Sequence, residues 1–470
     1  MMNKQTLPFS QLALSVIDVA RSARFWCEGL GFLPAGGTRM FNGRALTGVT
    51  GMPGAAATTW WMVDRSDWLQ LEIWQYDNPH AALMPPDHAP NDIGYSRCGV
   101  WVADFDATLA RLAEQAIQPI AAPQGAAGNR RVCVRDPDGI FVEMMEDDPL
   151  SEVTVVRPQC NVALRSVTLS TPDLEESLKS LCEGMGMPVH DSPLHDREHE
   201  ALWGLSGAQC QRQVLNAGPV LLEVVQYKSP KGKPRRVGAR LNDQGILNIA
   251  IGDARSSKKW KKVVDQATEA GWLPAKPIKT PLGGCNYFTG SQRFNIEIMW
   301  CRPGLGHRIS GFIPVPASKY PQPGNHVVEH SVDLSVAPEV VWGVLADHEG
   351  MSDWAGLGNV RITSAGFDGS NGRGLQRSVH TAVGQLLEQV FEWKPNESIG
   401  YRVIEGGPFS VYMGHVQLHP QGTGCRVVWK VEFRNRLPGA GPILKAVLSK
   451  KLRTMLEQGL PKELARRVQV

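Results

Sequence analysis

Apolar and polar positions alternate at several places along the first 150 residues, and the order of predicted elements occurs twice. Residues 11–18 alternate apolar and polar side chains, which predicts a strand, and residues 19–31 place apolar side chains at helical spacing. Further strand-like runs follow at 58–63 and 68–76. The same order then returns as a strand at 98–102, a helix at 105–115 and strands at 131–134 and 141–145. This internal repeat is the strongest organisational signal in the sequence.

A turn near the end of the second repeat makes the pattern more specific. Asp136-Pro137-Asp138-Gly139 places Pro at the second position of a turn and Gly where a positive φ is needed, directly before an alternating strand. With this turn and the repeat, residues 1–148 resemble a glyoxalase/bleomycin-resistance domain of the vicinal oxygen chelate (VOC) family. The resemblance implies two βαβββ modules whose curled sheets pack around one site.

Residues 160–303 resemble the same family more faintly. The strand-like runs that keep the family order are 166–169, 220–227, 247–251 and 295–300. The residues at 290–293, Gly-Ser-Gln-Arg, stand where the family has Asp-Pro-Asp-Gly. We therefore expect a second, degenerate VOC domain here, followed by a semi-rigid Pro- and Gly-rich linker over 304–325.

Residues 326–470 carry a different pattern. A strand-like run leads through Ala337-Pro338 into a short helix, after which come five alternating strands and a long amphipathic helix at 441–466. The apolar stripe of that helix consists of Ile443, Val447, Leu448, Leu452, Met455 and Leu456. This arrangement resembles the START/polyketide-cyclase (SRPBCC) superfamily, which implies a curved antiparallel sheet that grips the helix around a deep apolar cavity.

The predicted fold class is α+β, with two domains of paired βαβββ modules and one helix-grip domain. Lys and Arg exceed Asp and Glu by only 49 − 46 = 3, and no basic run with interleaved aromatic residues occurs, so nucleic acid is not an expected partner. Because no apolar run has the length of a membrane span or the pattern of a signal peptide, we expect no membrane association and a cytoplasmic location. Nine cysteines without a C-x-x-C pair indicate neither a disulfide framework nor a zinc site.

The family resemblance points to four ligand positions in the first domain. In the family, His or Gln and Glu from the first and last strands of paired modules hold a divalent metal, with open positions for the vicinal oxygens of a substrate. The matching positions here are Gln11, Glu72, Arg97 and Glu143. Arg97 stands where a His is expected, and its guanidinium offers no lone pair and repels a cation. We therefore predict a metal-free pocket, with Gln11, Glu72 and Glu143 as ligands if a divalent metal does bind.

Three roles remain open for the charged residues of this pocket, and we retain Glu72, Arg97 and Glu143 as candidate catalytic residues. Arg97 is suited to an ion pair with either Glu, or to a bidentate contact with a substrate carboxylate or enolate. A buried Glu with a raised pKa can act as general base on an acidic C–H. Alternatively, both Glu are remnants of the family pattern without a chemical task.

The second domain offers fewer ligands. Ser166, Glu223, Asn248 and Glu297 fall at the corresponding positions without a histidine among them, so a metal is expected even less there. The missing histidines also argue against an extradiol dioxygenase, whose iron needs two His and one carboxylate. Three histidines do occur in segment 190–199, where the polar surroundings favour a solvated loop.

In the third domain, strand alternation and the apolar stripe predict a cavity. Its candidate substrate-binding residues are Trp354, Trp429 and Phe433. The polar residues on neighbouring strands that can act as acid, base or orienting group are Arg377, His380, Glu388, Tyr401, Tyr412 and His415. Of these, we take His380, Tyr412 and His415 as candidate catalytic residues, although such a cavity can also hold a ligand without transforming it.

These observations lead to three hypotheses about function. The first is an enzyme of secondary metabolism or of aromatic or terpenoid catabolism, which isomerises, cyclises or eliminates on a bulky, mostly apolar, oxygenated substrate without a metal. It rests by analogy on the fusion of a cavity domain with pockets of a family that handles enolates. The second is a non-catalytic protein that binds or carries a hydrophobic compound, consistent with the losses at Arg97, Ser166 and Asn248. The third is a metal-dependent lyase or dioxygenase.

Overall fold

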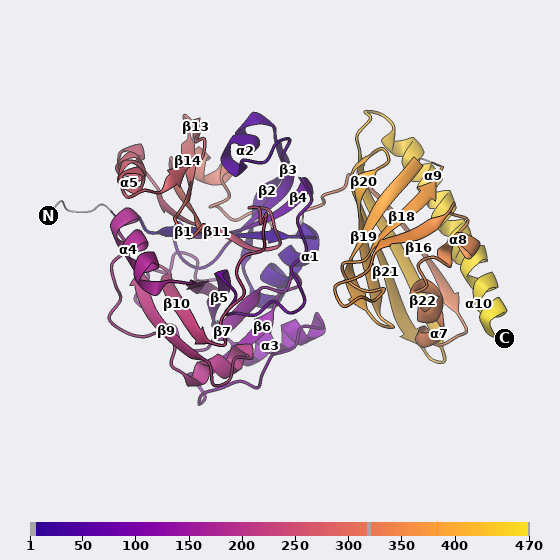
Figure 1. Cartoon of the computed structure of the whole chain (residues 1–470), viewed down its shortest axis with the longest axis horizontal. Coiled ribbons are helices and arrows are strands. Elements are labelled where there is room, and N and C mark those ends of the chain that lie inside the picture. The colour runs from indigo at the N-terminus through magenta and orange to yellow at the C-terminus, as the bar shows by residue number, and fades with distance from the viewer. Residues whose placement is uncertain (1–5, 317–320, 383, 469–470) are drawn as a thin grey trace. The chain divides into compact units, whose positions relative to one another are not determined.

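The computed structural model describes residues 6–316, 321–382 and 384–468, and the chain divides into two compact units, Met1–Pro321 and Gln322–Val470 (Figure 1). Both units mix strands and helices, which confirms the predicted α+β class. Within the described ranges, no helix is long and apolar enough to cross a membrane.

Unit 1 contains four modules that each begin with a strand followed by a helix. Module 1 comprises β1 (Phe9–Val16), α1 (Val19–Arg24) with a π-helical turn (Phe25–Leu30), β2 (Leu33–Asn42), α2 (Gly43–Thr50), β3 (Ala56–Val63) and β4 (Gln70–Asn78). Module 2 comprises β5 (Gly94–Val102), α3 (Phe105–Glu114), β6 (Arg131–Arg135) and β7 (Phe141–Met145). Module 3 comprises β8 (Val162–Ser170), α4 (Leu174–Gly184), a 3-10 turn (Glu198–Trp203), β9 (Gln209–Asn216) and β10 (Leu221–Ser229). Module 4 comprises β11 (Gly245–Asp253), α5 (Ser257–Glu269), β12 (Leu273–Pro274), β13 (Ile278–Thr280), β14 (Gly283–Thr289) and β15 (Asn295–Cys301).

The same local device starts the first helix of every module. In each case a short polar side chain at the end of the first strand accepts hydrogen bonds from backbone N–H groups of the first helical turn, which would otherwise lack a partner. The capping residues are Asp18, Asp104, Asp173 and Ser256. The repeat seen in the sequence is therefore a repeat of strand, cap and helix.

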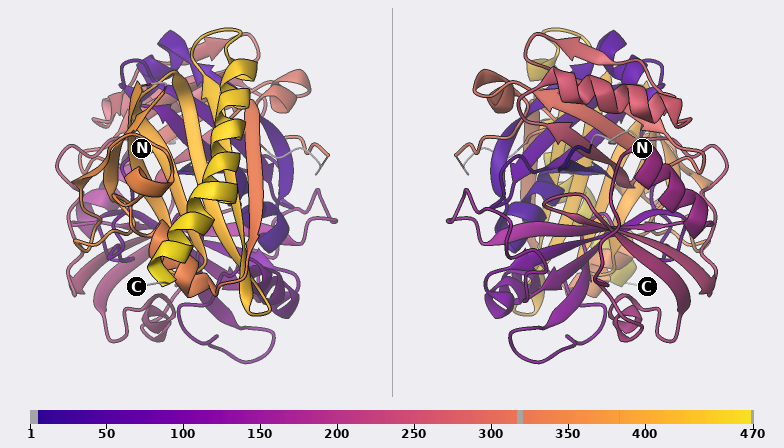
Figure 2. Two further views of the ribbon diagram at one scale, coloured as in Figure 1. Left: turned by 90° about the vertical axis from the view of Figure 1, so that its right-hand side faces the viewer. Right: turned by 90° about the vertical axis from the view of Figure 1, so that its left-hand side faces the viewer.

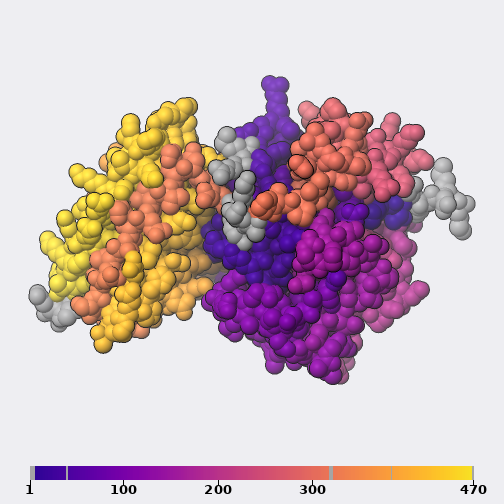
Figure 3. Space-filling model, turned by 180° about the vertical axis from the view of Figure 1, so that it is seen from behind, coloured from indigo at the N-terminus to yellow at the C-terminus, as the bar shows by residue number. Residues whose placement is uncertain are grey.

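The modules pair in an order that the sequence repeat does not predict. The repeat predicts that modules 1 and 2 close one domain over 1–148 and that modules 3 and 4 close another over 160–303. In the structure, β1 of module 1 pairs with β11 of module 4, in a sheet of order β12-β14-β15-β11-β1-β4-β3-β2, whereas β5 pairs with β8 in the order β6-β7-β5-β8-β10-β9. In Figure 3 the coral atoms of module 4 accordingly lie against the indigo atoms of module 1. β1, β8 and most of β11 are buried on both faces. Their sequence patterns therefore identify them as strands but do not show which strands lie beside them.

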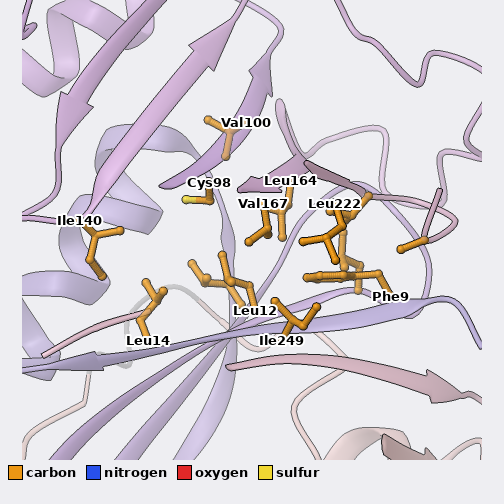
Figure 4. Packing of buried hydrophobic residues seen from close by; sticks show 14 of the residues in the cluster. Phe9, Leu12, Leu14, Cys98, Val100, Ile140, Leu164, Val167, Leu222 and Ile249 are labelled. Atoms are coloured by element: carbon orange, nitrogen blue, oxygen red, sulfur yellow. The ribbon is translucent and has the colours of Figure 1, made fainter. Parts of the chain in front are cut away.

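The two sheets of unit 1 share one hydrophobic core. Alternate residues of the central strands point toward each other between the sheets, as Figure 4 shows for Leu12, Leu14 and Ile249 of one sheet and Cys98 and Leu222 of the other. The residues between them in sequence therefore point to the opposite face of each sheet. Each sheet thus presents one face to the shared core and one face to a separate site.

The segment predicted as a linker, 304–325, is folded in its first half. Residues 305–309 form helix α6 (Leu305–Ile309), and Phe312 stacks on Trp68 with ring centroids 3.9 Å apart. Arg157 donates a hydrogen bond to the Phe312 carbonyl at 3.0 Å, which ties the segment to unit 1. Residues 317–320 lie outside the described residues. The Pro and Gly content predicted a linker, but Phe312 packs against unit 1. The linker prediction is therefore wrong for 305–315.

Unit 2 is an antiparallel sheet that holds a C-terminal helix. Its strands run in the order β16-β22-β21-β20-β19-β18-β17, and the helix crosses the sheet (Figure 2). The strands are β16 (His326–Leu334), β17 (Val360–Ser364), β18 (Gln376–Thr381), β19 (Gly384–Lys394), β20 (Ser398–Gly406), β21 (Phe409–Gln421) and β22 (Gly424–Asn435). The helices are α7 (Pro338–Leu345), α8 (Met351–Trp354), α9 (Gly441–Thr454) and α10 (Leu460–Val468), the last two joined by a π-helical turn at Met455–Gly459.

The buried stripe of the C-terminal helix differs in part from the predicted one. Leu452, Met455 and Leu456 are buried as expected, but Ile443 is 70% exposed and Val447 is 47% exposed. Both exposed positions lie in α9, ahead of the π-helical turn.

Candidate functional site

Strand register brings five polar side chains together on the outer face of the first sheet. In one row across the strands the neighbours are Gln70, Gln11, Ala250 and Glu297, and in the next row they are Glu72, Ala13 and Asn248. Paired residues of neighbouring strands point to the same face, so all of these side chains share it. The small side chains of Ala13 and Ala250 lie in the middle of this face and leave space between the polar groups. The residues come from modules 1 and 4.

A cavity of about 380 Å³ opens on this face. Glu72 and Glu297 reach it from β4 and β15, and both carboxyl groups are nearly inaccessible to bulk solvent, at 4% and 5% exposure. The aromatic residues that line the cavity are Phe41, Trp61, Trp74, Tyr76, Tyr287 and Trp300. The cavity is therefore an aromatic-walled space with two acidic groups at its base.

A relay of amide groups fixes the direction of the Gln11 side chain. Gln70 donates hydrogen bonds from Nε2 to the carbonyls of Ser310 and Gly311, at 2.7 and 2.6 Å. Backbone carbonyls only accept, so Oε1 of Gln70 must face Gln11, whose Nε2 donates to it at 2.7 Å. Gln11 Oε1 is then left without a hydrogen-bond partner among the described residues. The segment predicted as a linker thereby orients a residue of the site.

The two carboxyl groups hold protons more tightly than ordinary glutamates. Burial, followed by the charge of Glu297, raises the pKa of Glu72 from 4.5 to about 8, although Trp61 Nε1 donates a hydrogen bond to it at 2.7 Å. Burial likewise raises the pKa of Glu297 to about 7, partly offset by the polar side chains of Cys285, Tyr287 and Asn248. Two carboxyl groups with pKa values near 7 in one cavity are suited to general acid–base catalysis.

The donor atoms at this site also suit a divalent cation, the group that the VOC resemblance implies. Gln11 Oε1 and Asn248 Oδ1 are buried acceptors without a partner in the described part of the chain, and they accompany two carboxylates. No group of three or more His, Cys, Asp or Glu side chains within the described ranges is placed to hold a metal. The set of two carboxylate and two amide oxygens instead fits a hard, oxygen-preferring ion such as Mg²⁺ or Mn²⁺. Glu143, which the sequence places among the ligands, lies in the other sheet.

The second sheet holds four equivalent positions, and its register identifies them. Arg97 pairs with Thr168 and Thr168 with Glu223, while in the next row the neighbours are Glu143, Gly99 and Ser166. Arg97, Glu143, Ser166 and Glu223 therefore correspond to Gln11, Glu72, Asn248 and Glu297. The sequence grouped the ligand positions by modules 1 and 2 and by modules 3 and 4, whereas the structure pairs module 1 with module 4 and module 2 with module 3. Glu72 therefore lies in a different sheet from Arg97 and Glu143.

An ion-pair cluster fills the site of the second sheet. Nη2 of Arg97 lies 2.6 Å from Glu223, and the guanidinium stacks 3.7 Å above the ring of Trp203. His195 bridges the two carboxylates, with Nε2 2.8 Å from Glu143 and Nδ1 3.0 Å from Glu223. Since carboxylates only accept, both ring nitrogens of His195 must carry protons. The prediction of a solvated loop is therefore wrong for His195, which is 3% exposed.

The cluster explains the protonation of its members. Burial alone would lower the pKa of His195, but Glu143 and Glu223 together raise it. Burial alone would raise the pKa of Glu143, but His195 and Arg131 outweigh burial and lower it to about 2. The same two opposing effects, burial and nearby positive charges, leave the pKa of Glu223 well below its usual range. Arg97 and Glu143 are thus held in charged pairs, although Nε and Nη1 of Arg97 have no hydrogen-bond partner among the described residues.

Unit 2 contains a cavity of about 300 Å³ under the C-terminal helix. Arg377 and Glu388 lie in its wall as a buried pair, with Nε and Nη2 of the arginine 2.9 and 2.8 Å from the same carboxylate oxygen. Nη1 of Arg377 donates to Nδ1 of His348 at 2.7 Å, and burial with the Arg377 charge lowers the pKa of His348 to about 4. Sequence patterns gave no signal for His348, because it lies outside the regular strands.

The candidate residues of unit 2 separate into three groups. Tyr412 and Trp429 line the cavity, and Trp429 Nε1 donates to the hydroxyl of Tyr401 at 3.0 Å. His380 lines the cavity too, but it is exposed and its ring contacts the carbonyl of Asn359. The three others are not among the lining residues: His415, whose ring packs on Phe391, and the core residues Trp354 and Phe433. Tyr412 and His415 are an odd number of residues apart on β21, so they point to opposite faces.

Comparison with known families follows the division into units. Residues 9–144 match the family described as "Glyoxalase/Bleomycin resistance protein/Dioxygenase superfamily". Residues 325–469 match the family described as "Polyketide cyclase / dehydrase and lipid transport". The chain joins a glyoxalase-type part to a polyketide-cyclase-type part. Both resemblances drawn from the sequence are confirmed, and the matches support an enzymatic or ligand-binding role without naming a substrate.

Solved structures resemble the two parts separately. A putative dioxygenase from Bacillus subtilis is 13% identical, covers 67% of this chain and 92% of its own, and gives a TM-score of 0.46. Glyoxalase I from Zea mays is 13% identical over 63% of this chain and 92% of its own, with a TM-score of 0.43. The Zhui aromatase/cyclase from Streptomyces sp. R1128 is 23% identical over 30% of this chain and 95% of its own, with a TM-score of 0.27. No curated protein sequence matches the chain.

Proposed function

We propose that the chain is a small-molecule enzyme that isomerises, cyclises or eliminates on a bulky, mostly apolar, oxygenated substrate by proton transfer. The observation that carries this proposal is the pair of buried carboxyl groups, Glu72 and Glu297, in one aromatic-walled cavity. The carboxylates of the ion-pair cluster around Arg97, by contrast, are already paired with Arg97, Arg131 and His195.

The chemistry requires one carboxylate and one carboxylic acid at the same time. With pKa values of about 8 and about 7, Glu72 and Glu297 both titrate near neutral pH, so one can be protonated while the other is ionised. The ionised carboxylate removes a proton from a C–H next to a carbonyl. The protonated one returns a proton, either to another carbon in an isomerisation or to the departing oxygen in an elimination. No oxidant or reductant is needed.

The surroundings select the substrate and orient the reacting groups. Trp61 holds one oxygen of Glu72 through its indole N–H, which fixes the direction of the carboxyl group. Phe41, Trp74 and Tyr287 offer flat apolar surfaces to an aromatic or polyketide-like body. A volume of about 380 Å³ suits a compound of two or three fused rings.

A divalent cation is compatible with this proposal but is not required by it. Gln11, Glu72, Asn248 and Glu297 would hold the cation, which would polarise a substrate carbonyl and acidify the neighbouring C–H. The roles of Trp61 in orientation and of the aromatic walls in binding are the same in both cases.

Deuterium exchange tests the proposal without knowledge of the natural substrate. Bicyclic aryl ketones such as 2-tetralone are incubated with the full chain in D₂O, with and without Mn²⁺, and deuterium uptake is followed by mass spectrometry. We expect Glu72→Gln and Glu297→Gln each to reduce the enzyme-dependent rate by about 100-fold or more. Glu269→Gln, at an exposed position on α5, is the matched control and should exchange like the wild type. Equal rates for all four proteins would refute the proposal.

A second candidate function is the binding of a hydrophobic compound in unit 2. It is favoured by the apolar lining of the 300 Å³ cavity and by the mutual neutralisation of Arg377 and Glu388 there. Native mass spectrometry of the full chain with anthrone should show one bound ligand. Trp429→Ala should weaken that binding, whereas Phe367→Ala, at an exposed position outside the lining, should not. Unchanged binding by Trp429→Ala would exclude the cavity.

A further inference from the structure

Unit 1 contains another cavity, of about 330 Å³, where the chain crosses between its two sheets. One wall comes from the segment that links β4 to β5, and the other comes from the segment that links β10 to β11. The two crossing segments are joined by hydrogen bonds from Ile93 N to the Lys233 carbonyl and from Lys233 N to Asp92, both 2.9 Å. This crossover cavity shares no lining residue with the cavity of Glu72 and Glu297.

The floor of the crossover cavity is apolar. The residues that form it are Met84, Ile93, Ile140, Ile246, Leu247 and Phe294. Such a lining, in a volume of about 330 Å³, favours a compact apolar body such as a bicyclic ring system. The floor alone does not distinguish a neutral ligand from a charged one.

The rim is charged, and its carboxylates are already occupied. Asp87 pairs with Lys233 at 2.6 Å, Asp243 with Arg236 at 2.7 Å, and Asp92 with His88 at 3.1 Å. Each of the three acidic side chains among the described lining residues thus has a basic partner, and the pair of Asp92 with His88 is an ion pair only when His88 is protonated. The positive charges that remain on the rim therefore decide its electrostatic character.

Two arginines of the rim lack a carboxylate partner. Arg235 donates from Nη1 to the Arg293 carbonyl at 2.5 Å, and Arg240 donates from Nη2 to the His80 carbonyl at 3.0 Å. Neither forms an ion pair with a carboxylate anywhere in the described ranges. Desolvation lowers the pKa of Arg235, while both arginine side chains remain exposed at the rim. Their guanidinium groups can therefore reach an incoming carboxylate or phosphate.

A hydroxyl group lies in the same cavity with its hydrogen-bonding capacity unused. Ser96 is 2% exposed and lines the cavity, and its Oγ has no hydrogen-bond partner in the described part of the chain. A buried hydroxyl without a partner is costly, and a ligand oxygen would satisfy it. This observation is independent of the charges on the rim.

We propose that the crossover cavity is a binding site for a small molecule that joins a compact apolar body to an anionic head group. Arg235 and Arg240 receive the head group, the floor receives the body, and Ser96 bonds to a polar atom of the ligand. A carboxylate and a phosphate monoester share this chemistry. The site does not depend on the function proposed for Glu72 and Glu297.

Calorimetric titration of the full chain tests the site with three probes of the same body: 1-naphthoate, 1-naphthyl phosphate and the neutral 1-naphthamide. We expect at least one anion to bind with one-to-one stoichiometry and at least tenfold more tightly than the amide. The tighter of the two anions identifies the head group. Equal affinity of the amide and both anions, or binding of neither anion, would overturn the proposal.

Variants assign the binding to this cavity rather than to the other two. Arg235→Ala should weaken the anion about tenfold or more, whereas Lys231→Ala removes the same charge from the same segment outside the lining and should leave affinity within about twofold. Ala239→Trp fills the cavity from its rim without removing a charge and should also abolish binding. Wild-type affinity in both Arg235→Ala and Ala239→Trp would overturn the proposal.

Discussion

Replacement of Glu72 by Gln should make the protein more stable at high pH and not at low pH. Burial and the neighbouring Glu297 raise the pKa of Glu72 from 4.5 to about 8. Between these pH values the folded chain keeps a proton that the unfolded chain has lost, so the free energy of unfolding falls as pH rises from about 4.5 to about 8 and then levels off. At about 1.36 kcal/mol per pKa unit, the wild type loses roughly 5 kcal/mol over this range through Glu72. The Gln side chain has nearly the same shape as Glu72 but carries no group that titrates in this pH range.

Chemical unfolding of the full chain at pH 5 and pH 9, with a chelator present, measures this effect. We expect Glu72→Gln to match the wild type at pH 5 to within about 1 kcal/mol, and to exceed it by about 2 kcal/mol or more at pH 9. Glu269→Gln, whose side chain is exposed on α5, should follow the wild type at both pH values. A Glu72→Gln protein that is equally destabilised at both pH values would refute the reasoning, because it would mean that the carboxyl group is ionised and well partnered in the folded chain.

Further predictions concern the amide relay, the ion-pair cluster and acid stability. Gln70→Leu removes the group that orients Gln11, so if Mn²⁺ binds at the proposed cation site, the variant should weaken this binding, measured by electron paramagnetic resonance, by about 10-fold or more. Arg97→Met removes the buried guanidinium partner of Glu223 and should lower the free energy of unfolding by about 3 kcal/mol or more in urea, whereas Arg197→Met, at an exposed position, should not. Because the pKa of Glu143 is lowered to about 2, the cluster should stabilise the fold above about pH 4.5 and lose that stabilisation as pH falls toward 2, which thermal unfolding across this range will show.

The local elements of the fold were predictable because their signals are local. Strand alternation and capping residues such as Asp104 lie within a few positions of the element they define. The four family positions of each sheet were also found one by one. Their grouping could not be predicted, because Glu72 and Glu297 are separated by more than 200 residues and are joined only through the register of β1 with β11.

The remaining residues gave signals that pointed in the wrong direction. His195 lies in a polar segment, and polarity in sequence does not reveal a side chain that is buried between two carboxylates. Residues 305–315 are rich in Gly and Pro, yet Phe312 anchors them and their carbonyls orient Gln70. In both cases tertiary contacts determine the structure, and composition describes only the average environment of such segments.

The central claim is that chemistry takes place in the cavity of Glu72 and Glu297 and not in its counterpart around Arg97. Glu72 and Glu143 occupy equivalent positions in the two sheets, so Glu72→Gln and Glu143→Gln form a matched pair. The decisive measurement is the rate of deuterium uptake by 2-tetralone for each variant, per mole of folded protein. We predict that Glu72→Gln loses about 100-fold or more while Glu143→Gln retains the wild-type rate. Loss of the rate in Glu143→Gln with retention in Glu72→Gln would contradict the claim.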